Sequence, residues 1–160
     1  MKTKGTVGVK LIECIDKYRN IYRVRYDITE EEDGISYEEY EFNHKPSLDE
    51  IKDVILDYYN SKIDETIISG FIWNEMQIWL TTENQFNYKA TFDLAMQTNG
   101  SNLPIVFKFG TTSEPIYYSF TTIEELNDFY TKAIAYINAT LKTGWNEKDA
   151  IDWTLYNILN

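Results

Sequence analysis

Residues 66–90, TIISGFIWNEMQIWLTTENQFNYKA, form the stretch that decides how the rest of the chain is interpreted. Its apolar residues are dense, and the short polar segment Asn74-Glu75-Met76 divides them into two runs rich in aromatic and β-branched side chains. This pattern predicts two strands joined by a tight turn. Because two strands alone are marginal in water, we expect this hairpin to bury one face against helices on either side.

Three helix starts have the spacing of a capping box, in which a hydroxyl and a carboxylate or amide three residues later satisfy backbone donors. These pairs are Ser47 with Glu50, Thr82 with Gln85, and Thr122 with Glu125. Apolar residues at helical spacing then predict helices over about 48–66, 83–98 and 123–144. Gly70 is expected to follow the first helix in the left-handed region, and Gly144 is expected to end the third.

The second of these helices carries apolar residues over a wide arc, so we expect it to be well buried. Its apolar residues are Phe86, Ala90, Phe92, Leu94, Ala95 and Met96. After the third helix, Asn146 with Asp149 predicts a short last helix carrying Ala150 and Trp153.

The first 45 residues predict a three-stranded antiparallel meander. Strand patterns cover residues 6–15, 20–28 and 35–42. The middle strand alternates tyrosine and valine with Arg23 and Arg25, and we expect these cations to lie across the sheet from acids such as Glu39 and Glu41. A second hairpin, with strands at 103–109 and 115–120, is predicted near the middle of the remaining sequence.

The order of these elements predicts an α+β fold. A β meander (1–45) precedes an α+β region (46–160) in the order helix, hairpin, helix, hairpin, helix and short C-terminal helix. We expect the two to form one compact unit overall, because no linker-like composition separates them.

The chain is acidic, with a formal net charge of −11, and the charge is unevenly distributed. Residues 1–26 carry about +5, residues 27–65 about −11 and the remainder about −5. Binding to DNA or RNA requires lysine and arginine against phosphate, so this balance argues against direct nucleic-acid binding. It permits a basic protein partner. The candidate acidic patch consists of Glu30, Glu31, Glu32, Asp33, Glu38, Glu39 and Glu41.

The residue types needed for common active sites are scarce. His44 is the only histidine and Cys14 the only cysteine, which leaves no zinc-ligand set and no intrachain disulfide. The acids at 30–33 lie on an expected solvated tip, where consecutive carboxylates do not converge on one metal ion. We therefore expect no enzyme, no cofactor and no metal site.

No signal peptide or membrane span is expected, because no apolar run approaches eighteen residues. This predicts a soluble protein of the cytoplasm.

Aromatic residues are the strongest pointer to a binding surface, since tryptophan and tyrosine are enriched at protein interfaces. The candidate interface residues are Trp73, Trp79, Tyr117, Tyr130, Trp145 and Trp153. Two alternatives stay open: the same residues are core aromatics of a small α+β domain, or some of them form a sugar-binding shelf.

Residues from about Ile63 to Trp153 also carry a family resemblance. Its motifs are IDETIISGFIWNEMQIWLTTENQFNYKA at 63–90, FKFG at 107–110, FTTIEEL at 120–126 and GWxxKDAIDW at 144–153. In these motifs the chain resembles a family of uncharacterised small proteins from phages and prophages of gut bacteria. It is more distantly similar to the uncharacterised domain found in tail-fibre and tail-assembly proteins of tailed phages. The resemblance implies a virion structural or assembly module and supplies no catalytic residues.

Together these observations predict a phage or prophage accessory protein that acts by protein–protein binding. A tail, baseplate or fibre-associated structural or assembly component is the first hypothesis, and it leaves homo-oligomerisation open. The alternative is an acidic phage-encoded inhibitor that covers a basic surface of a host defence or nucleic-acid-binding protein.

Overall fold

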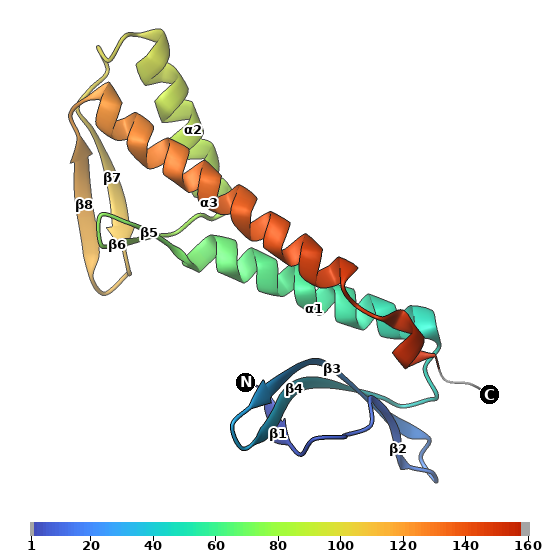
Figure 1. Cartoon of the computed structure of the whole chain (residues 1–160). Coiled ribbons are helices and arrows are strands. Elements are labelled where there is room, and N and C mark those ends of the chain that lie inside the picture. The colour runs from blue at the N-terminus through green and yellow to red at the C-terminus, as the bar shows by residue number, and fades with distance from the viewer. Residues whose placement is uncertain (1, 158–160) are drawn as a thin grey trace. The chain divides into compact units, whose positions relative to one another are not determined.

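The computed structural model describes residues 2–157 and has an α+β fold (Figure 1). The chain divides into two compact units. The first, here the N-terminal unit, comprises Met1–Tyr59 with Lys148–Asn160, and the second, here the central unit, comprises Asn60–Glu147. Two helices, α1 (Leu48–Ser69) and α3 (Ile123–Asp149), contribute residues to both units.

The N-terminal unit contains a four-stranded antiparallel sheet in the order β1-β4-β3-β2. Its strands are β1 (Thr3–Gly5), β2 (Ile12–Asp16), β3 (Ile21–Glu31) and β4 (Gly34–Phe42). The prediction of three strands is therefore wrong. The segment 6–15 is not one strand, because Gly8 adopts a φ of 88° and separates β1, which pairs with β4, from β2, which pairs with β3.

One face of this sheet is covered by the first turns of α1 and by the 3-10 helix η1 (Trp153–Tyr156). The buried residues of this core are Val24, Tyr26, Phe42, Ile51, Ile55, Tyr59 and Tyr156. Alternation along β3 directs Val24 and Tyr26 to this face, and spacing of four residues along α1 directs Ile51, Ile55 and Tyr59 to meet them.

The central unit contains two hairpins and a third helix. Its remaining elements are β5 (Phe71–Trp73), β6 (Met76–Ile78), α2 (Thr82–Gln97), β7 (Ile105–Gly110) and β8 (Pro115–Phe120). The β5–β6 turn contains only Asn74 and Glu75, whose φ angles of 47° and 63° are those of a type I′ turn. Met76, predicted within the turn, is the first residue of β6.

The core of the central unit is dominated by aromatic rings. Phe129 of α3 lies 5.1–5.5 Å, between ring centroids, from Trp73, Tyr88, Phe109 and Phe120. These rings come from β5, α2, β7 and β8, so one side chain of α3 contacts every layer that surrounds it. Offset and edge-on aromatic pairs add to the stabilisation that burial alone provides.

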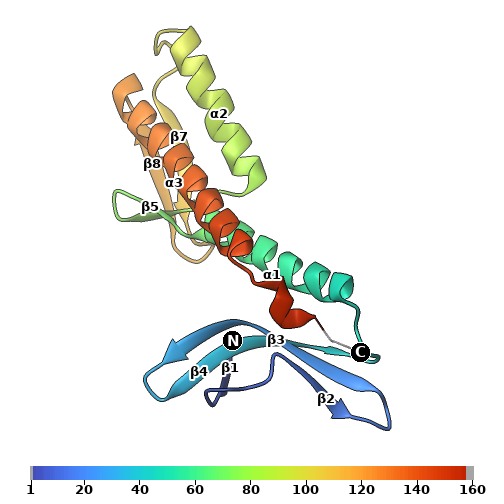
Figure 2. The same cartoon turned by 45° about the vertical axis from the view of Figure 1, so that its right-hand side comes forward.

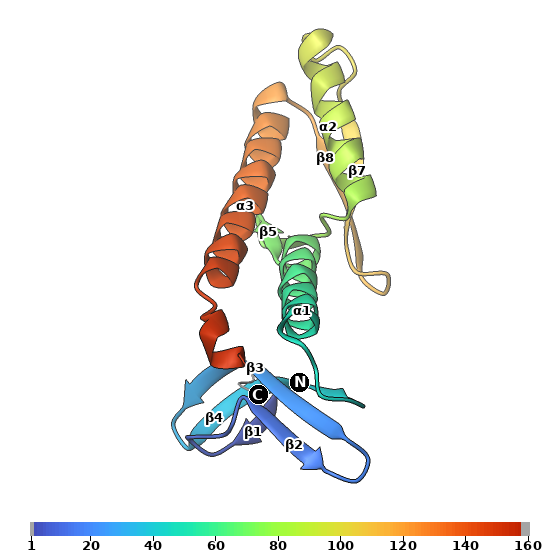
Figure 3. The ribbon, with the colours of Figure 1, turned by 90° about the vertical axis from the view of Figure 1, so that its right-hand side faces the viewer.

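Helix α2 is less buried than predicted. It lies beside the β7–β8 hairpin at the margin of the central unit (Figures 2 and 3), and its fully buried residues are Tyr88 and Ala95. Phe86 is 73% exposed, and Leu94 and Met96 are also exposed. The apolar arc is wider than the face that the core covers, because α2 has neighbours on one side only.

One predicted capping box, at Ser47, is formed in full. At Thr122 only the hydroxyl half is formed, because the Glu125 carboxylate accepts from the Thr121 N–H (3.3 Å). The Glu50 N–H donates to Ser47 Oγ (3.3 Å) and the Ser47 N–H to Glu50 Oε2 (2.8 Å), while the Glu125 N–H donates to Thr122 Oγ1 (3.2 Å). For α2 the prediction is one residue late. Thr81 is the N-cap and accepts from the Asn84 N–H, and the Gln85 amide donates to the Leu80 carbonyl instead of closing the box.

Gly70 directly follows α1, as predicted, but its predicted left-handed conformation is wrong, and so is the predicted helix end at Gly144. Gly70 does not have a positive φ, and α3 continues through Gly144 to Asp149. Each glycine instead permits a close approach: a Cβ on Gly70 would lie 2.1 Å from the Tyr136 hydroxyl oxygen, and one on Gly144 would lie 2.2 Å from the Ile63 side chain. The predicted last helix is replaced by η1, which is capped by Asp152.

Candidate functional site

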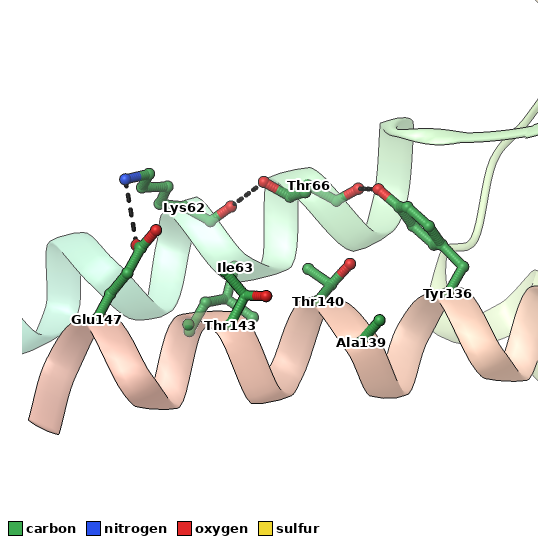
Figure 4. Close-up of a pocket in the computed structure, with 9 residues that line it drawn as sticks. Lys62, Ile63, Thr66, Tyr136, Ala139, Thr140, Thr143 and Glu147 are labelled. Atoms are coloured by element: carbon green, nitrogen blue, oxygen red, sulfur yellow. Dashed lines mark hydrogen bonds and ion pairs between the residues drawn. The ribbon is translucent and has the colours of Figure 1, made fainter.

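A groove between α1 and α3 is the first candidate site of the central unit (Figure 4). It has a volume of about 260 Å³. Its lining residues are Lys62, Ile63, Thr66, Tyr136, Ala139, Thr140, Thr143, Gly144 and Glu147. The small side chains let the two helices approach, while the groove remains open along their seam.

The polar groups of this groove hold the helices together. Lys62 Nζ lies 3.3 Å from Glu147 Oε2, the Tyr136 hydroxyl donates to the Thr66 carbonyl (2.7 Å), and the Thr66 hydroxyl donates to the Lys62 carbonyl (2.7 Å), as Figure 4 shows. Each of these contacts joins a group of α1 to one of α3 or closes a turn within α1. The arrangement therefore fixes the seam between the two helices.

The β7–β8 hairpin presents a second candidate surface. Phe107 and Phe109 pair with Tyr118 and Ile116 on the face toward the helices. On the opposite face Lys108 pairs with Tyr117, and Val106 pairs with Ser119. Tyr117 is 68% exposed and Val106 57% exposed, so an aromatic and an aliphatic side chain lie together on an uncovered sheet face.

The structure separates the aromatic residues predicted as an interface. Trp73 is 3% exposed and its indole N–H donates to Asp128 Oδ2 (3.0 Å), so it is a core residue. Trp79 is partly buried, with its indole N–H donating to the Gly110 carbonyl (2.7 Å). Tyr130 is partly buried and stacks on Phe92 at 4.5 Å.

The remaining candidates differ in exposure. Trp145 on α3 is 53% exposed, and Tyr117 lies on the exposed face of the β7–β8 hairpin. Trp153 belongs to the N-terminal unit, where it is partly buried and has Lys52 Nζ 6.0 Å from its ring centroid. Tyr117 and Trp145 are the predicted residues with more than half of their surface exposed.

The predicted acidic patch is not one continuous anionic surface. Glu30, Glu31, Glu32 and Asp33 are exposed at the tip of the β3–β4 hairpin. Glu41 lies 2.5 Å from Arg23, and Glu39 lies 3.5 Å from Arg23 and 3.7 Å from Arg25. The register that pairs these residues confirms the expected charge ladder, and it also neutralises this part of the patch. Glu38 pairs with Tyr26 and is partly buried.

The burial of Arg25 is a feature that the sequence did not reveal. Only 5% of this residue is exposed. It donates to the Lys10 carbonyl (2.8 Å) and to Glu13 Oε2 (2.9 Å), and lies 5.4 Å from the ring centroid of Tyr37. Its Nε has no hydrogen-bond partner, nor has Glu39 Oε2, and the same two atoms are 3.7 Å apart. The guanidinium charge is therefore compensated by carboxylates of the same sheet.

His44 and Glu50 form a local contact at the start of α1. The His44 ring Nε2 lies 2.8 Å from Glu50 Oε1, and the Ser47 N–H and hydroxyl bind the same carboxylate. These hydrogen bonds, chiefly those from Ser47 and then that from His44, lower the pKa of Glu50 to about 2. The contact is that of a helix cap.

Asp27 forms a second polar cluster in the N-terminal unit. Its carboxylate accepts from the Tyr58 hydroxyl (2.6 Å) and lies 3.0 Å from Lys2 Nζ. Burial, followed by the hydrogen bond to Asp27, raises the pKa of Tyr58. Asp27 itself has a φ of 49° where the β3–β4 register shifts, so the cluster stabilises an irregular point of the sheet.

Residues 2–157 contain no group of three or more histidine, cysteine, aspartate or glutamate side chains placed to hold a metal ion. Within the same residues, no helix has the length and apolar character of a membrane span.

No protein-family model, no curated protein and no solved structure matches this sequence or its fold.

Proposed function

We propose that this protein acts by binding another protein through the outer face of the β7–β8 hairpin. The observation that supports the proposal most directly is the exposure of Tyr117, an amphipathic aromatic residue, and of the aliphatic Val106 on adjacent strands. Aromatic residues that combine an apolar ring with a polar tip are enriched at protein interfaces and carry much of their binding energy.

The setting that we propose is that of a phage or prophage accessory protein. A structural or assembly component associated with a tail, baseplate or fibre accords with the sequence resemblance of residues 63–153, on which this part of the proposal rests. Such a component requires a stable scaffold and a binding surface and does not require a catalytic centre.

A photo-reactive residue at position 117, introduced into the full chain in phage-producing cells, tests this proposal. We expect a discrete cross-link to a virion protein, and we expect the protein in purified virions by mass spectrometry. The matched control places the same residue at Tyr18, which is fully exposed in the N-terminal unit. Identical cross-linking patterns from both positions, or none from position 117, would contradict the proposed surface.

An acidic inhibitor of a basic host protein is the second candidate. It is favoured by one observation, the four consecutive exposed acids 30–33 at the β3–β4 tip. Capture at two salt concentrations separates the two functions, because an electrostatic complex weakens steeply with salt. Salt-sensitive capture of a host nucleic-acid-binding protein, lost when residues 30–33 are neutralised, would support the inhibitor.

A further inference from the structure

Strand β8 has an open edge in the part of the chain that the structure describes. The β7–β8 sheet has two strands, and β8 pairs with β7 alone. Pro115, Tyr117 and Ser119 are exposed, and no backbone hydrogen bond outside the β7–β8 ladder involves them. In Figure 1, β8 forms the margin of the central unit on the side away from α2 and α3.

The hairpin register identifies which backbone groups face this edge. The Thr111 N–H donates to the Glu114 carbonyl (3.2 Å), and hydrogen-bonded and non-hydrogen-bonded pairs alternate along an antiparallel ladder. Ile116 and Tyr118 therefore direct their N–H and C=O groups toward β7, while Tyr117 and Ser119 direct theirs toward the open side. Pro115, which has no N–H, also falls at an outward position, where proline is tolerated.

The edges of the N-terminal sheet differ from this one. Edge strands are commonly protected from further pairing by shortness, charge, proline or a bulge. Strand β8 has one of these features, Pro115 at its first residue, whereas each edge strand of the N-terminal sheet has two. Strand β1 has three residues and carries Lys4, and β2 carries Glu13 and Asp16 and has a register shift. Strand β8, with the sequence PIYYSF, has six residues, a regular register and no charged side chain.

We infer that β8 accepts an extended segment of a partner protein as a third strand of this sheet. This inference rests on the proposed function and specifies the partner. The segment alternates apolar and polar side chains, because its residues meet Ile116 and Tyr118 on one face and the more polar Tyr117 and Ser119 on the other.

Charge complementarity predicts a partner segment with basic residues at its two ends. The chain carries a net charge of −11, and the exposed acids Glu114 and Glu124 flank β8 before and after the strand. Lysine or arginine at the ends of an added strand meets these acids. Lys108 lies one strand further in, opposite Tyr117, so an uncharged polar side chain suits the middle of the partner segment.

A second copy of this chain suits the edge less well. A six-residue strand is roughly 20 Å long, and edge-to-edge pairing of that length buries much less than the roughly 800 Å² per partner of a stable interface. Two chains with a charge of −11 also repel one another.

The test is amide hydrogen exchange of the full chain with a synthetic peptide of alternating valine and threonine that has lysine at both ends. We expect exchange at Tyr117 and Ser119 to slow by at least about tenfold when the peptide is saturating. A peptide with glutamate in place of lysine should bind about tenfold more weakly at low salt, and N-methylation of alternate peptide bonds should abolish the protection.

Two variants complete the test. Ser119→Pro removes an outward N–H and should abolish peptide binding, whereas Ser119→Ala keeps the N–H and should bind as the parent does. Exchange in the parent chain needs no variant, so a folding defect in Ser119→Pro leaves that measurement valid.

Unchanged exchange at Tyr117 and Ser119 at saturating peptide would overturn the inference, as would equal binding of the lysine and glutamate peptides. Concentration-dependent protection without peptide, together with a doubled mass in solution, would overturn it in favour of a second copy. If position 117 cross-links a virion protein equally in the parent chain and in Ser119→Pro, the proposed function stands and strand addition fails. If that cross-link is absent while the peptide is bound as expected, the strand inference stands and the proposed function fails.

Discussion

The four-stranded sheet of the N-terminal unit and the β7–β8 hairpin of the central unit differ in how they use polar side chains. In the first, Arg25 is buried among Glu13, Glu39 and Tyr37, so charge lies within the sheet. In the second, the covered face is built from aromatic and aliphatic residues, and the polar partners lie at its rim, as Glu125 does beside Tyr118.

This difference extends to the sheet edges. The N-terminal sheet ends in short, charged or irregular strands, whereas the hairpin ends in an uncharged regular one. Opposite-charge pairs across neighbouring strands stabilise the register that the buried face of the sheet sets. A two-stranded hairpin takes its register from its turn and its aromatic face, and among the described residues β8 pairs with β7 alone.

The largest expected effect comes from Phe129→Ala in the aromatic core. Removing this ring should lower the free energy of unfolding by about 3–5 kcal/mol. The substitution abolishes the ring contacts with Trp73, Tyr88 and Phe120 and leaves a cavity between them. Urea denaturation followed by tryptophan fluorescence measures the change. The control is Phe86→Ala on the exposed side of α2, which should alter stability by no more than about 0.5 kcal/mol, and equal losses would refute the assigned core.

The next largest effect is expected for Arg25→Ala. Loss of the buried guanidinium should destabilise the N-terminal unit by about 3 kcal/mol, because the partly buried Glu39 loses one of its two arginine neighbours. The matched variant Arg23→Ala removes a more exposed pair and should cost about 1 kcal/mol or less. Hydrogen exchange of β3 amides locates the change, and a smaller loss for Arg25 than for Arg23 would contradict the charge-within-sheet comparison.

Tyr58→Phe should lower stability by about 1 kcal/mol, since it removes the hydroxyl that donates to Asp27. The folded-state pKa of Tyr58 is raised, so its contribution is complete below its ordinary pKa and is lost as pH rises through the folded value. Stability measured from neutral to alkaline pH should therefore fall in the parent chain and fall less in the variant. Tyr40→Phe, on the exposed side of β4, is the control, and a similar change in both variants would count against the hydrogen bond.

Glu50→Gln tests how much the cap at the start of α1 contributes to stability at low pH. The folded-state pKa of Glu50 is about 2, against an ordinary value of 4.5, so the unfolded chain binds more protons between these values. The contribution of Glu50 to stability is present above pH 4.5 and is lost as pH falls toward about 2. The variant should show a shallower decline in thermal midpoint over that range, and an unchanged slope would show that the cap does not contribute.

The smallest effect is expected at the acidic tip. Replacing residues 30–33 by their amides should change stability by no more than about 0.5 kcal/mol, because these side chains are exposed. Urea denaturation of the folded variant measures the change. A loss of folding would show that the tip carries structural contacts beyond its place in the turn.

Local patterns predicted much of the secondary structure and little of the candidate site. Capping at Ser47 and Thr122 depends on residues that are close in sequence. The pairing of Arg23 with Glu41 depends on strand alternation. Both kinds of pattern can be read from the sequence. The exposure of Tyr117 and the burial of Trp73 are not visible, because both lie in similar aromatic strands. The uncharged character of β8 was present in the sequence, but its open edge depends on what packs beside it.

The sequence by itself determined an acidic α+β chain with the starts of its first and third helices, its two hairpins and its charge ladder. Tertiary structure alone decided that β1 joins β4, that α3 continues through Gly144, and which aromatic rings face the core. The physical reason is that glycine favours a helix end only when nothing compensates for its flexibility. At Gly144 the close contact with Ile63 provides that compensation, and such a contact between residues far apart in the chain leaves no local signature.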